Sequence, residues 1–261
     1  MEPLRPITAE PSRSALFFDV DGTLAPIVER AADAKVPKET SQLLGRLSRR
    51  YACVGCISGR GAQDVRRLVG VGGIAYAGLH GAELLEPNTS KAVVLPEFAE
   101  FMSEVQGFAG GHDTSELRAL RVRIEDKGPI MSFHWRGAPD DEAAHALVRR
   151  IAEDAEAEGL WTHWGRKVLE IRPPVLIGKD RAVRELLARK PARNALYAGD
   201  DVTDLDGFRA VRELVEKGEL DRAVAIGARS DEGPREIVEE ADLVVDGIEG
   251  MQRVLAELDR Q

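Results

Sequence analysis

Hydrophobic residues recur in two patterns that alternate near both ends of the chain. Short apolar runs followed by Asp, Gly or Ser are typical of buried strands, whereas apolar residues three or four positions apart predict helices. The first part of the chain predicts strands at 15–18, 54–57 and 74–77 and helices at 38–50 and 62–69. The last part predicts helices at 180–190, 205–215, 232–240 and 248–258 and strands at 195–198, 223–226 and 243–245. This alternation predicts an α/β fold, a doubly wound parallel sheet with helices on both faces.

The middle of the chain has a different pattern. It predicts strands at 92–95, 119–125, 130–135 and 167–171 and helices at 96–107 and 140–158. Longer strands combined with two long helices favour an antiparallel sheet in an α+β layer. We therefore expect a core formed by residues 1–81 and 173–261, interrupted by an inserted α+β domain at residues 82–172.

The length and charge of the chain narrow the possible functions. Its 261 residues can bury a sizeable core, and its net charge of −9 argues against nucleic acid or an anionic membrane as a partner. No apolar stretch approaches the roughly 18 residues that a membrane helix needs. Residues 1–13 contain no hydrophobic segment typical of a signal peptide, so we expect a short, partly ordered lead-in and a cytoplasmic protein.

The two cysteines, Cys53 and Cys56, lie in one predicted strand. No second pair of Cys or His at a suitable spacing accompanies them, which argues against a zinc site. A redox pair is expected at the start of a helix, and this pair is not at one. Their odd separation directs the two side chains to opposite faces of the strand, so we expect both to pack in the interior.

Polar residues follow three of the predicted core strands. The carboxyl ends of parallel strands meet at one edge of an open α/β sheet, where ligands bind. The residues directly after these strands are mostly acids: Asp19, Asp21, Ser58, Arg60, Asp200, Asp201 and Asp204. Like charges at one site cost energy unless a cation offsets them. The pattern therefore predicts a divalent cation held by carboxylates, and Mg²⁺ with phosphate is the usual pairing.

A structural interpretation competes with this one for single residues. Asp, Ser and Gly all favour turns and helix caps. Thr203 or Asp204 could cap the helix expected from residue 205, and that alternative stays open. Turn chemistry does not account for five clustered acids.

Two acids at a spacing of two residues suit phosphoryl transfer. Asp19 can attack phosphorus as a nucleophile, and Asp21 can protonate the leaving alkoxide and then activate water. Gly22 permits a sharp turn, and Thr23 offers a hydroxyl group to a phosphate oxygen. Lys179, at the start of an expected helix, lies at the unfavourable end of the helix dipole, which predicts an anion close to it.

These residues resemble the four motifs of the haloacid dehalogenase superfamily: Asp19-Val-Asp-Gly-Thr-Leu24, Ser58, Lys179 and Gly199-Asp200-Asp201. The resemblance implies that Asp19 is the nucleophile and Asp21 the acid/base. It also implies a metal site built by Asp19, the backbone carbonyl of Asp21, Asp200 and Asp201. Ser58 and Lys179 are implied to bind the transferring phosphoryl group.

A closer similarity, to the trehalose-6-phosphate phosphatase family, extends over most of the chain. The stretches that carry it include Ile57-Ser-Gly-Arg60, Gly78-Leu-His-Gly-Ala-Glu83, Glu125-Asp-Lys127, His134-Trp-Arg136, Val168-Leu-Glu-Ile-Arg-Pro173 and Gly199-Asp-Asp-Val-Thr-Asp204. In that family the insert is a cap that closes over the sugar. The resemblance implies that five residues line the cleft between cap and core: Arg60, Lys127, His134, Arg136 and Glu170. Asp180, Trp135 and Leu205 depart from the residues common in the family.

The implied activity is Mg²⁺-dependent hydrolysis of trehalose 6-phosphate through an aspartyl-phosphate intermediate. Two alternatives remain. One is another sugar-phosphate phosphatase, of the sucrose-phosphate or mannosyl-3-phosphoglycerate type. The other is a non-catalytic regulator that binds a phosphosugar, although a binder has no need of the second acid, Asp21. The similarity covers no glycosyltransferase domain, so a trehalose-6-phosphate synthase is expected as a separate chain.

Overall fold

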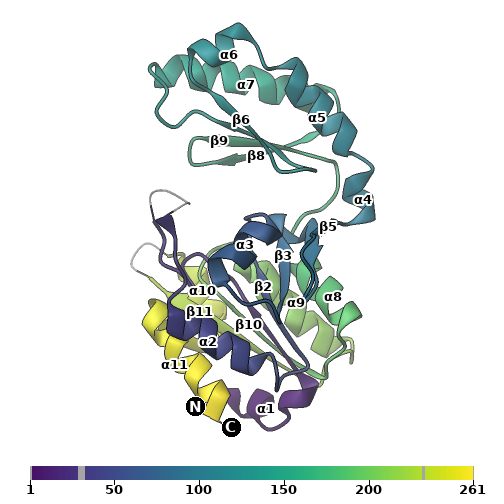
Figure 1. The fold of residues 1–261 in the computed structure, drawn as a ribbon, viewed down its shortest axis with the longest axis vertical. Helices are drawn as coiled ribbons and strands as arrows, with labels where there is room; N and C mark the ends of the chain where they lie inside the picture. Colours follow the sequence, from purple (N-terminus) through teal and green to yellow (C-terminus); the bar gives the residue numbers. More distant parts are fainter. Residues whose placement is uncertain (1, 29–32, 231–232, 261) are drawn as a thin grey trace. The chain divides into compact units, whose positions relative to one another are not determined.

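The computed structural model describes residues 2–28, 33–230 and 233–260. The chain divides into two compact units, one formed by Met1–Val93 with Ile177–Gln261 and the other by Val94–Leu176 (Figure 1). The second unit is thus inserted between two halves of the first. Each unit has a sheet and a hydrophobic core of its own.

The first unit contains an eight-stranded sheet in the order β12-β11-β10-β1-β2-β3-β4-β5. Its strands are β1 (Ser14–Phe18), β2 (Cys53–Ile57), β3 (Ala75–Gly78), β4 (Glu83–Leu85), β5 (Val93–Val94), β10 (Asn194–Gly199), β11 (Arg222–Arg229) and β12 (Leu243–Asp246). The six strands from β12 to β3 are parallel, and β4 runs antiparallel to β3. The predicted α/β fold with a doubly wound parallel sheet is confirmed.

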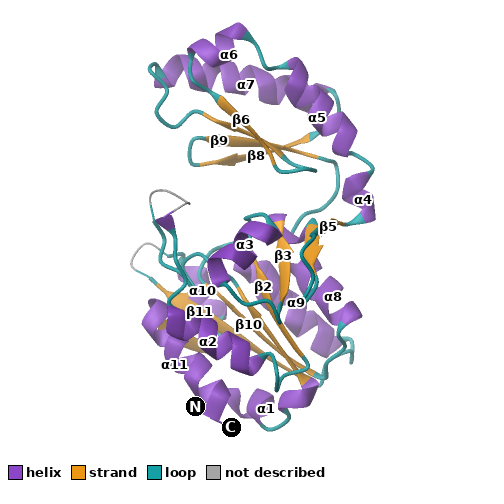
Figure 2. Cartoon of the chain, in the orientation of Figure 1, coloured by secondary structure: helices purple, strands orange, loops and turns teal. Residues whose placement is uncertain are grey.

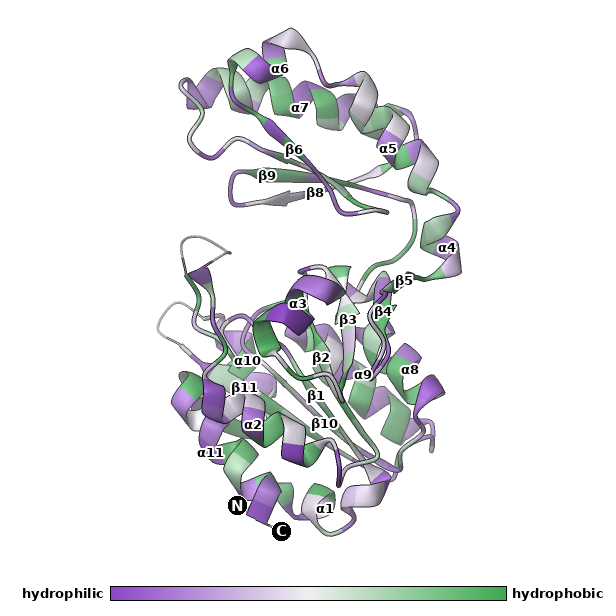
Figure 3. Cartoon of the chain, in the orientation of Figure 1, coloured by the Kyte–Doolittle hydropathy of each residue, from purple (hydrophilic) through white to green (hydrophobic). Residues whose placement is uncertain are grey.

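Helices cover both faces of this sheet (Figure 2). They are α1 (Arg5–Thr8), α2 (Lys38–Leu47), α3 (Ala62–Val69), α8 (Lys179–Arg189), α9 (Asp204–Glu216), α10 (Arg235–Glu240) and α11 (Gly247–Arg260). Leu16 and Phe18 belong to the core cluster shared with α2, α3 and α11. Phe17, between them, points to the opposite face, as the period of two in a strand requires. Both faces are buried, which explains the unbroken apolar character of the central strands (Figure 3).

The order of the strands places a switch point at β1. From β1 the chain continues to β2 and β3 on one side, and β10, β11 and β12 extend the sheet on the other. Crevices at such points are where open α/β sheets bind ligands, at the carboxyl ends of the strands. The residues after β1 and β10 therefore lie at the favoured position for a site.

The N-terminal segment differs from the expectation of a partly ordered lead-in, which was wrong. Leu4 and Ile7 are fully buried and belong to the main core cluster. The hydroxyl group of Ser14 also lies 2.8 Å from the carbonyl oxygen of Glu10 and 3.0 Å from that of Ile7. Two buried aliphatic side chains in so short a segment are enough to dock it against the sheet.

The two cysteines are buried and free, as their pattern predicted. Burial raises the pKa of the Cys53 thiol to about 12. It also raises the pKa of Cys56. Both thiols are therefore protonated and unreactive at neutral pH.

The second unit packs helices on one face of a four-stranded antiparallel sheet of order β6-β7-β9-β8 (Figure 2). Its elements are α4 (Pro96–Ala99), α5 (Met102–Gly111), α6 (Ser115–Ala119), β6 (Arg123–Asp126), β7 (Met131–His134), α7 (Asp141–Ala157), β8 (Trp161–Gly165) and β9 (Val168–Arg172). Phe133, Leu169 and Ile171 point to the helices and are buried there. The other face of the sheet is polar.

Local differences from the predicted elements have physical causes. The helix expected at 96–107 is two helices, α4 and α5, and the strand expected at 119–125 begins only at Arg123, after α6.

Neither β4 nor β8 was predicted. No residue of β8 is fully buried, so this strand has no apolar alternation to reveal it. Because β4 is paired with β3, the division between the units falls at Val94 rather than near residue 82.

Candidate active site

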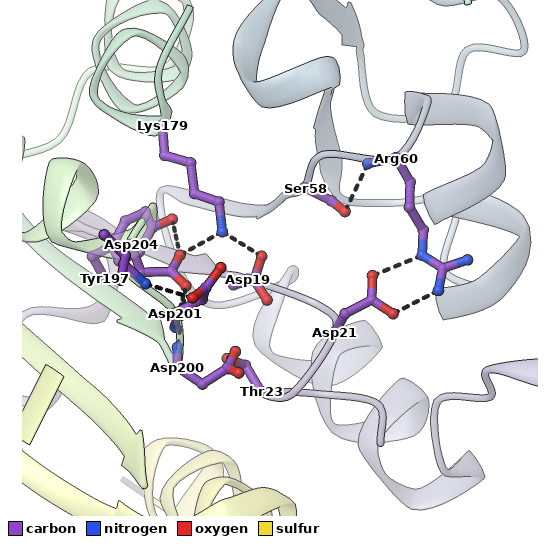
Figure 4. A network of polar contacts seen from close by, with 11 residues as sticks. Asp19, Asp21, Thr23, Ser58, Arg60, Lys179, Tyr197, Asp200, Asp201 and Asp204 are labelled. Atoms are coloured by element: carbon purple, nitrogen blue, oxygen red, sulfur yellow. Dashed lines mark hydrogen bonds and ion pairs between the residues drawn. The ribbon is translucent and has the colours of Figure 1, made fainter. Parts of the chain in front are cut away.

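Asp19 lies at the switch point, directly after β1, with a buried side chain (Figure 4). Its backbone N–H donates to the carbonyl oxygen of Ala198 on β10 at 2.8 Å, which extends the β1–β10 ladder by one residue. The ammonium group of Lys179, the first residue of α8, donates to Oδ1 of Asp19 at 2.6 Å. The anion predicted near the start of this helix is therefore supplied by the protein itself.

Asp204 is the centre of the network around Lys179. Its Oδ1 accepts hydrogen bonds from Lys179 at 2.7 Å and from the hydroxyl group of Tyr197 at 2.8 Å. Its Oδ2 accepts from the backbone N–H groups of Asp200 and Asp201, both at 3.1 Å. Four hydrogen bonds occupy the acceptor positions of this carboxylate. Asp204 therefore fixes both Lys179 and the turn after β10.

Asp200 and the Asp19–Thr23 loop meet at close range. The hydroxyl group of Thr23 donates to Oδ1 of Asp200 at 2.9 Å, and both side chains are buried. Gly22 has a φ of +89°, and a Cβ atom there would lie 1.9 Å from Oδ2 of Asp200. Only glycine fits this position, both for its backbone conformation and for the closeness of the carboxylate. Thr23, expected to bind phosphate, here orients Asp200.

Burial dominates the electrostatics of the cluster. It raises the pKa of Asp19 well above the usual value, against the opposing effect of Lys179. Burial, followed by repulsion from Asp204, raises the pKa of Asp200 to about 7. Burial alone would lower the pKa of Lys179, but Asp19 and Asp204 outweigh it and raise that pKa. One ammonium group thus faces three buried carboxyl groups, and the site lacks positive charge.

The donor set fits a divalent cation. Carboxylate oxygens of Asp19, Asp200 and Asp204 lie within 4.8 Å of one another. Oxygen ligands of this kind suit Mg²⁺ or Ca²⁺ rather than the metals that prefer nitrogen or sulfur. Asp204 already accepts four hydrogen bonds, so Asp19 and Asp200 are the side chains with acceptor positions left for a metal ion.

Asp21 faces away from this cluster and is held by Arg60. The guanidinium group donates from Nε to Oδ2 at 2.7 Å and from Nη2 to Oδ1 at 2.6 Å, a bidentate pair. Ser58, two residues earlier and directly after β2, is buried, and its Oγ accepts from the backbone N–H of Arg60 at 3.1 Å. The hydroxyl proton of Ser58 remains available for an acceptor such as a phosphate oxygen.

Two residues considered from the sequence lie outside this cluster. The side chain of Asp201 is exposed, and its Oδ1 accepts from the backbone N–H of Val202 at 2.7 Å. Thr203 precedes α9, but its side chain makes no capping hydrogen bond. Neither Thr203 nor Asp204 therefore caps α9 with its side chain. The carboxylate of Asp204 binds Lys179, Tyr197 and the backbone of the turn after β10 instead.

The polar face of the second unit gathers another set of predicted residues. Lys127 donates to Oε1 of Glu170 at 3.0 Å, and Arg172 donates to Oε2 at 2.6 Å. Burial acts to raise the pKa of Glu170, but the two cations outweigh it and lower that pKa to about 2. His134 Nε2 lies 2.7 Å from Glu125 Oε2 on the neighbouring strand. Burial lowers the pKa of His134, and Glu125 opposes this effect.

Arg136 lies just past β7, where its Nη2 is 3.5 Å from the carbonyl oxygen of Arg166. Sequence reasoning missed the roles of Asp204, Tyr197 and Arg172. For Asp204 a signal was available in the sequence. Asp200 and Asp204 stand on either side of a turn that leads from a strand to a helix.

A model of the trehalose-phosphatase family matches residues 17–238. The chain belongs to the trehalose-phosphatase family. This confirms the resemblance inferred from the motifs. The chain is 34% identical over 213 residues to the trehalose-phosphate phosphatase of Mycobacterium marinum, with 76% of this chain and 52% of that protein covered. It is 36% identical over 212 residues to an uncharacterized glycosyl hydrolase of Mycobacterium tuberculosis, with 77% of this chain and 15% of that protein covered.

Members of this family and related proteins share the fold. A trehalose-6-phosphate phosphatase related protein superimposes with a TM-score of 0.72 at 22% identity, covering 94% of this chain and 97% of that one. The trehalose-6-phosphate phosphatase of Aspergillus fumigatus gives a TM-score of 0.66 at 22% identity, covering 99% and 97%. The chain spans about half the length of its Mycobacterium marinum relative. No helix within the described residues is long and apolar enough to cross a membrane.

Proposed function

We propose that this trehalose-phosphatase family member hydrolyses trehalose 6-phosphate to trehalose and phosphate, with Mg²⁺ as its cofactor and an aspartyl-phosphate intermediate. The observation that carries this proposal is the position of Asp19. Its buried carboxyl group lies at the switch point, 2.6 Å from the ammonium group of Lys179, with Asp200 beside it and Asp21 two residues later. The trehalose-phosphate phosphatases among its relatives support the choice of substrate.

In the first step Asp19 attacks the phosphorus atom. A bond forms between its carboxylate oxygen and phosphorus, and the bond from phosphorus to the sugar oxygen breaks. Asp21 gives its proton to the departing sugar oxygen, so the products of this step are trehalose and phosphorylated Asp19. In the structure Arg60 donates to both oxygens of Asp21, so one of these two hydrogen bonds must open before Asp21 can carry and donate the proton.

In the second step Asp21, now ionised, takes a proton from water as this water attacks the phosphorus atom. The bond between phosphorus and Asp19 breaks, phosphate leaves and both carboxyl groups return to their starting states. Lys179 and the hydroxyl group of Ser58 stabilise the charge on the phosphoryl oxygens in both steps. The direct contact of Lys179 with Asp19 also offsets the repulsion between the nucleophile and an anionic substrate.

Asp19 and Asp200, with the backbone carbonyl of Asp21, would hold the Mg²⁺ ion. When bound, this ion supplies positive charge that Lys179 alone does not provide. The deficit of positive charge around three buried carboxyl groups supports this assignment. Asp204 takes no part in metal binding in this proposal and keeps Lys179 and the turn after β10 in place.

The inserted unit serves as a cap domain that recognises the sugar. Lys127, His134, Arg136 and Glu170 supply hydrogen-bond donors and acceptors suited to a ligand with many hydroxyl groups. The half-buried ion pairs of Glu170 with Lys127 and Arg172 fix two of these side chains before a ligand arrives, which lowers the entropic cost of binding.

The test is phosphate release from trehalose 6-phosphate, sucrose 6-phosphate, glucose 6-phosphate and mannosyl-3-phosphoglycerate, each with Mg²⁺ or with EDTA. We expect a strong Mg²⁺-dependent preference for trehalose 6-phosphate. Asp19→Asn should abolish turnover while the protein remains folded, and Asp21→Asn should block it as well. Activity on only one of the other phosphosugars would show that trehalose 6-phosphate is not the substrate. No activity on any substrate would favour a regulator that only binds phosphosugars.

A further inference from the structure

Two tryptophans on β8 have similar exposure but different surroundings. The exposed fraction is 44% for Trp161 and 41% for Trp164. Trp164 packs edge-on against His145 of α7 and against Trp135, with ring centroids 5.6 Å and 6.1 Å apart. Within the described part of the chain, Trp161 makes no such ring contact. Packing therefore accounts for Trp164 and leaves the exposed indole of Trp161 unexplained.

The strand register assigns the two indoles to opposite faces of the sheet. Trp161 pairs with Arg172, whereas Trp164 pairs with Leu169, which is buried against the helices. Thr162, on the same face as Trp164, donates a hydrogen bond to Glu156 of α7 at 2.6 Å. Trp161 therefore stands on the polar face, in line with Arg172 and beside the Lys127–Glu170–Arg172 network.

The chemistry of that face suits a sugar ring. A pyranose ring has C–H groups on its faces and hydroxyl groups around its rim, so it needs a flat apolar surface next to hydrogen-bonding groups. The indole of Trp161 is such a surface, and Glu170 is two residues away on the neighbouring strand, roughly 8 Å between backbones. Arg172 and Lys127 supply donors and Glu170 supplies an acceptor.

The same face also contains a buried hydroxyl group next to Glu170. Ser132 on β7 pairs with Glu170 across the strands, and its side chain is completely buried. Its Oγ has no hydrogen-bond partner among the described residues. A buried polar group without a partner costs stability, so this part of the face has a hydrogen-bonding group that the described protein atoms leave unused.

We propose that Trp161 forms a stacking platform for a pyranose ring of the sugar phosphate. Glu170, Lys127 and Arg172 bind hydroxyl groups of the ligand, and the indole covers the C–H face of the ring that reaches the end of β8. A disaccharide phosphate gains binding energy from both the indole and the polar groups, whereas a substrate without a sugar gains binding energy from neither. The inference rests on the proposed function and adds to it a residue that determines the preference for a disaccharide.

The chain offers a matched control, because Trp164 has the same side chain and similar exposure on the other face of β8. We compare kcat/KM for trehalose 6-phosphate with kcat/KM for p-nitrophenyl phosphate, which has no sugar. Trp161→Ala should lower the ratio of these two values by roughly ten- to thirty-fold, the effect of exposing one aromatic contact. Trp164→Ala should leave the ratio within about two-fold of the parent, and Trp161→Phe should restore most of the loss.

A binding measurement separates this inference from the proposed function. Trehalose itself should change the tryptophan fluorescence of the parent protein and of Trp164→Ala, but not of Trp161→Ala. If the parent has no phosphatase activity yet shows this pattern, the proposed function fails and the sugar platform stands. Equal kinetic ratios and equal fluorescence responses in the two alanine variants would overturn the platform. A change in oligomeric state confined to Trp161→Ala, without a change in sugar binding, would overturn it in favour of a protein contact.

Discussion

The two polar clusters of this molecule are opposites in charge balance. In the core unit, three buried carboxyl groups share one ammonium group, and burial raises the pKa of Asp200 to about 7. In the inserted unit, one carboxylate, Glu170, lies between two cations, which lower its pKa to about 2 despite burial. The side chains of Lys127, Arg172 and Glu170 are 20%, 14% and 14% exposed, so both clusters are largely shielded from water.

The difference separates a site that needs an ion from one that does not. A cluster with too little positive charge is unstable by itself and gains from a bound cation. A cluster that pairs its own charges is stable without a ligand, and it presents fixed donors and acceptors to a neutral molecule. The direction of a pKa shift therefore points to the metal site in the core, whereas the paired network suits sugar hydroxyl groups.

Removal of the single cation of the core cluster should have the largest effect. Lys179→Met leaves Asp19 and Asp204 without a counter-charge in the interior, which we expect to lower the free energy of unfolding by about 3–5 kcal/mol. Turnover should be lost together with stability. Urea unfolding at neutral pH measures the first effect, and phosphate release measures the second.

Lys190→Met is the matched control, because Lys190 directly follows the same helix but is exposed. This change should alter the free energy of unfolding by less than about 0.5 kcal/mol. Equal unfolding curves for the two variants would show that the ammonium group of Lys179 does not stabilise the buried carboxyl groups.

Metal binding should depend on pH in the direction set by Asp200. Its pKa in the folded state, about 7, exceeds the value of roughly 3.9 in the unfolded chain, so the metal-free protein should lose stability between about pH 4 and pH 7. Mg²⁺ at 100 times its dissociation constant adds about 2.7 kcal/mol to the free energy of unfolding.

The rise in melting temperature caused by Mg²⁺ should therefore be larger near pH 8 than near pH 5.5, since the metal binds the ionised carboxylates. In Asp200→Asn this rise should disappear, and the loss of stability with pH should become smaller. A rise that is independent of pH, or that persists in Asp200→Asn, would place the metal on other groups.

The sequence allowed the core to be predicted better than the insert, for a physical reason. Strands buried on both faces, such as β1 and β10, appear in the sequence as continuous apolar runs. The polar residues that directly follow them, Asp19 and Asp200, indicate the site. Edge strand β8 has no buried residue to mark it, so its pattern carried no signal. Leu4 and Ile7 dock an N-terminal segment that three prolines made look irregular.

Within the site, the motifs predicted which acids gather but not how their hydrogen bonds are divided. Asp204 was considered as a helix cap, yet its carboxylate binds Lys179, Tyr197 and two backbone N–H groups. Tyr197, Asp200 and Asp201 lie within seven residues of Asp204, whereas Lys179 belongs to α8. The packing of α8 against α9 brings Lys179 to Asp204, and spacing along the β10–α9 segment does not reveal that contact.

The smallest effect should come from the balanced cluster of the insert. Glu170→Gln leaves Lys127 and Arg172 facing each other without a carboxylate, and we expect a loss of about 1–2 kcal/mol in the free energy of unfolding at neutral pH. The pKa of Glu170 is about 2 in the folded state and roughly 4.3 in the unfolded chain, so the ionised carboxylate stabilises the fold at pH values above roughly 4.3. This contribution is lost as the pH falls toward 2. The difference between parent and variant should therefore narrow below about pH 4, opposite to the trend of Asp200.

Glu116→Gln serves as the control for this variant. Glu116 also pairs with a cation, Arg150 at 2.9 Å, but its side chain is 61% exposed, so its loss should cost less than about 1 kcal/mol. A difference for Glu170→Gln that stays constant down to about pH 2 would mean that the carboxylate gains nothing from its two cations. In that case the charges of the insert would not stabilise one another, and only the deficit of positive charge in the core would remain of the comparison between the two clusters.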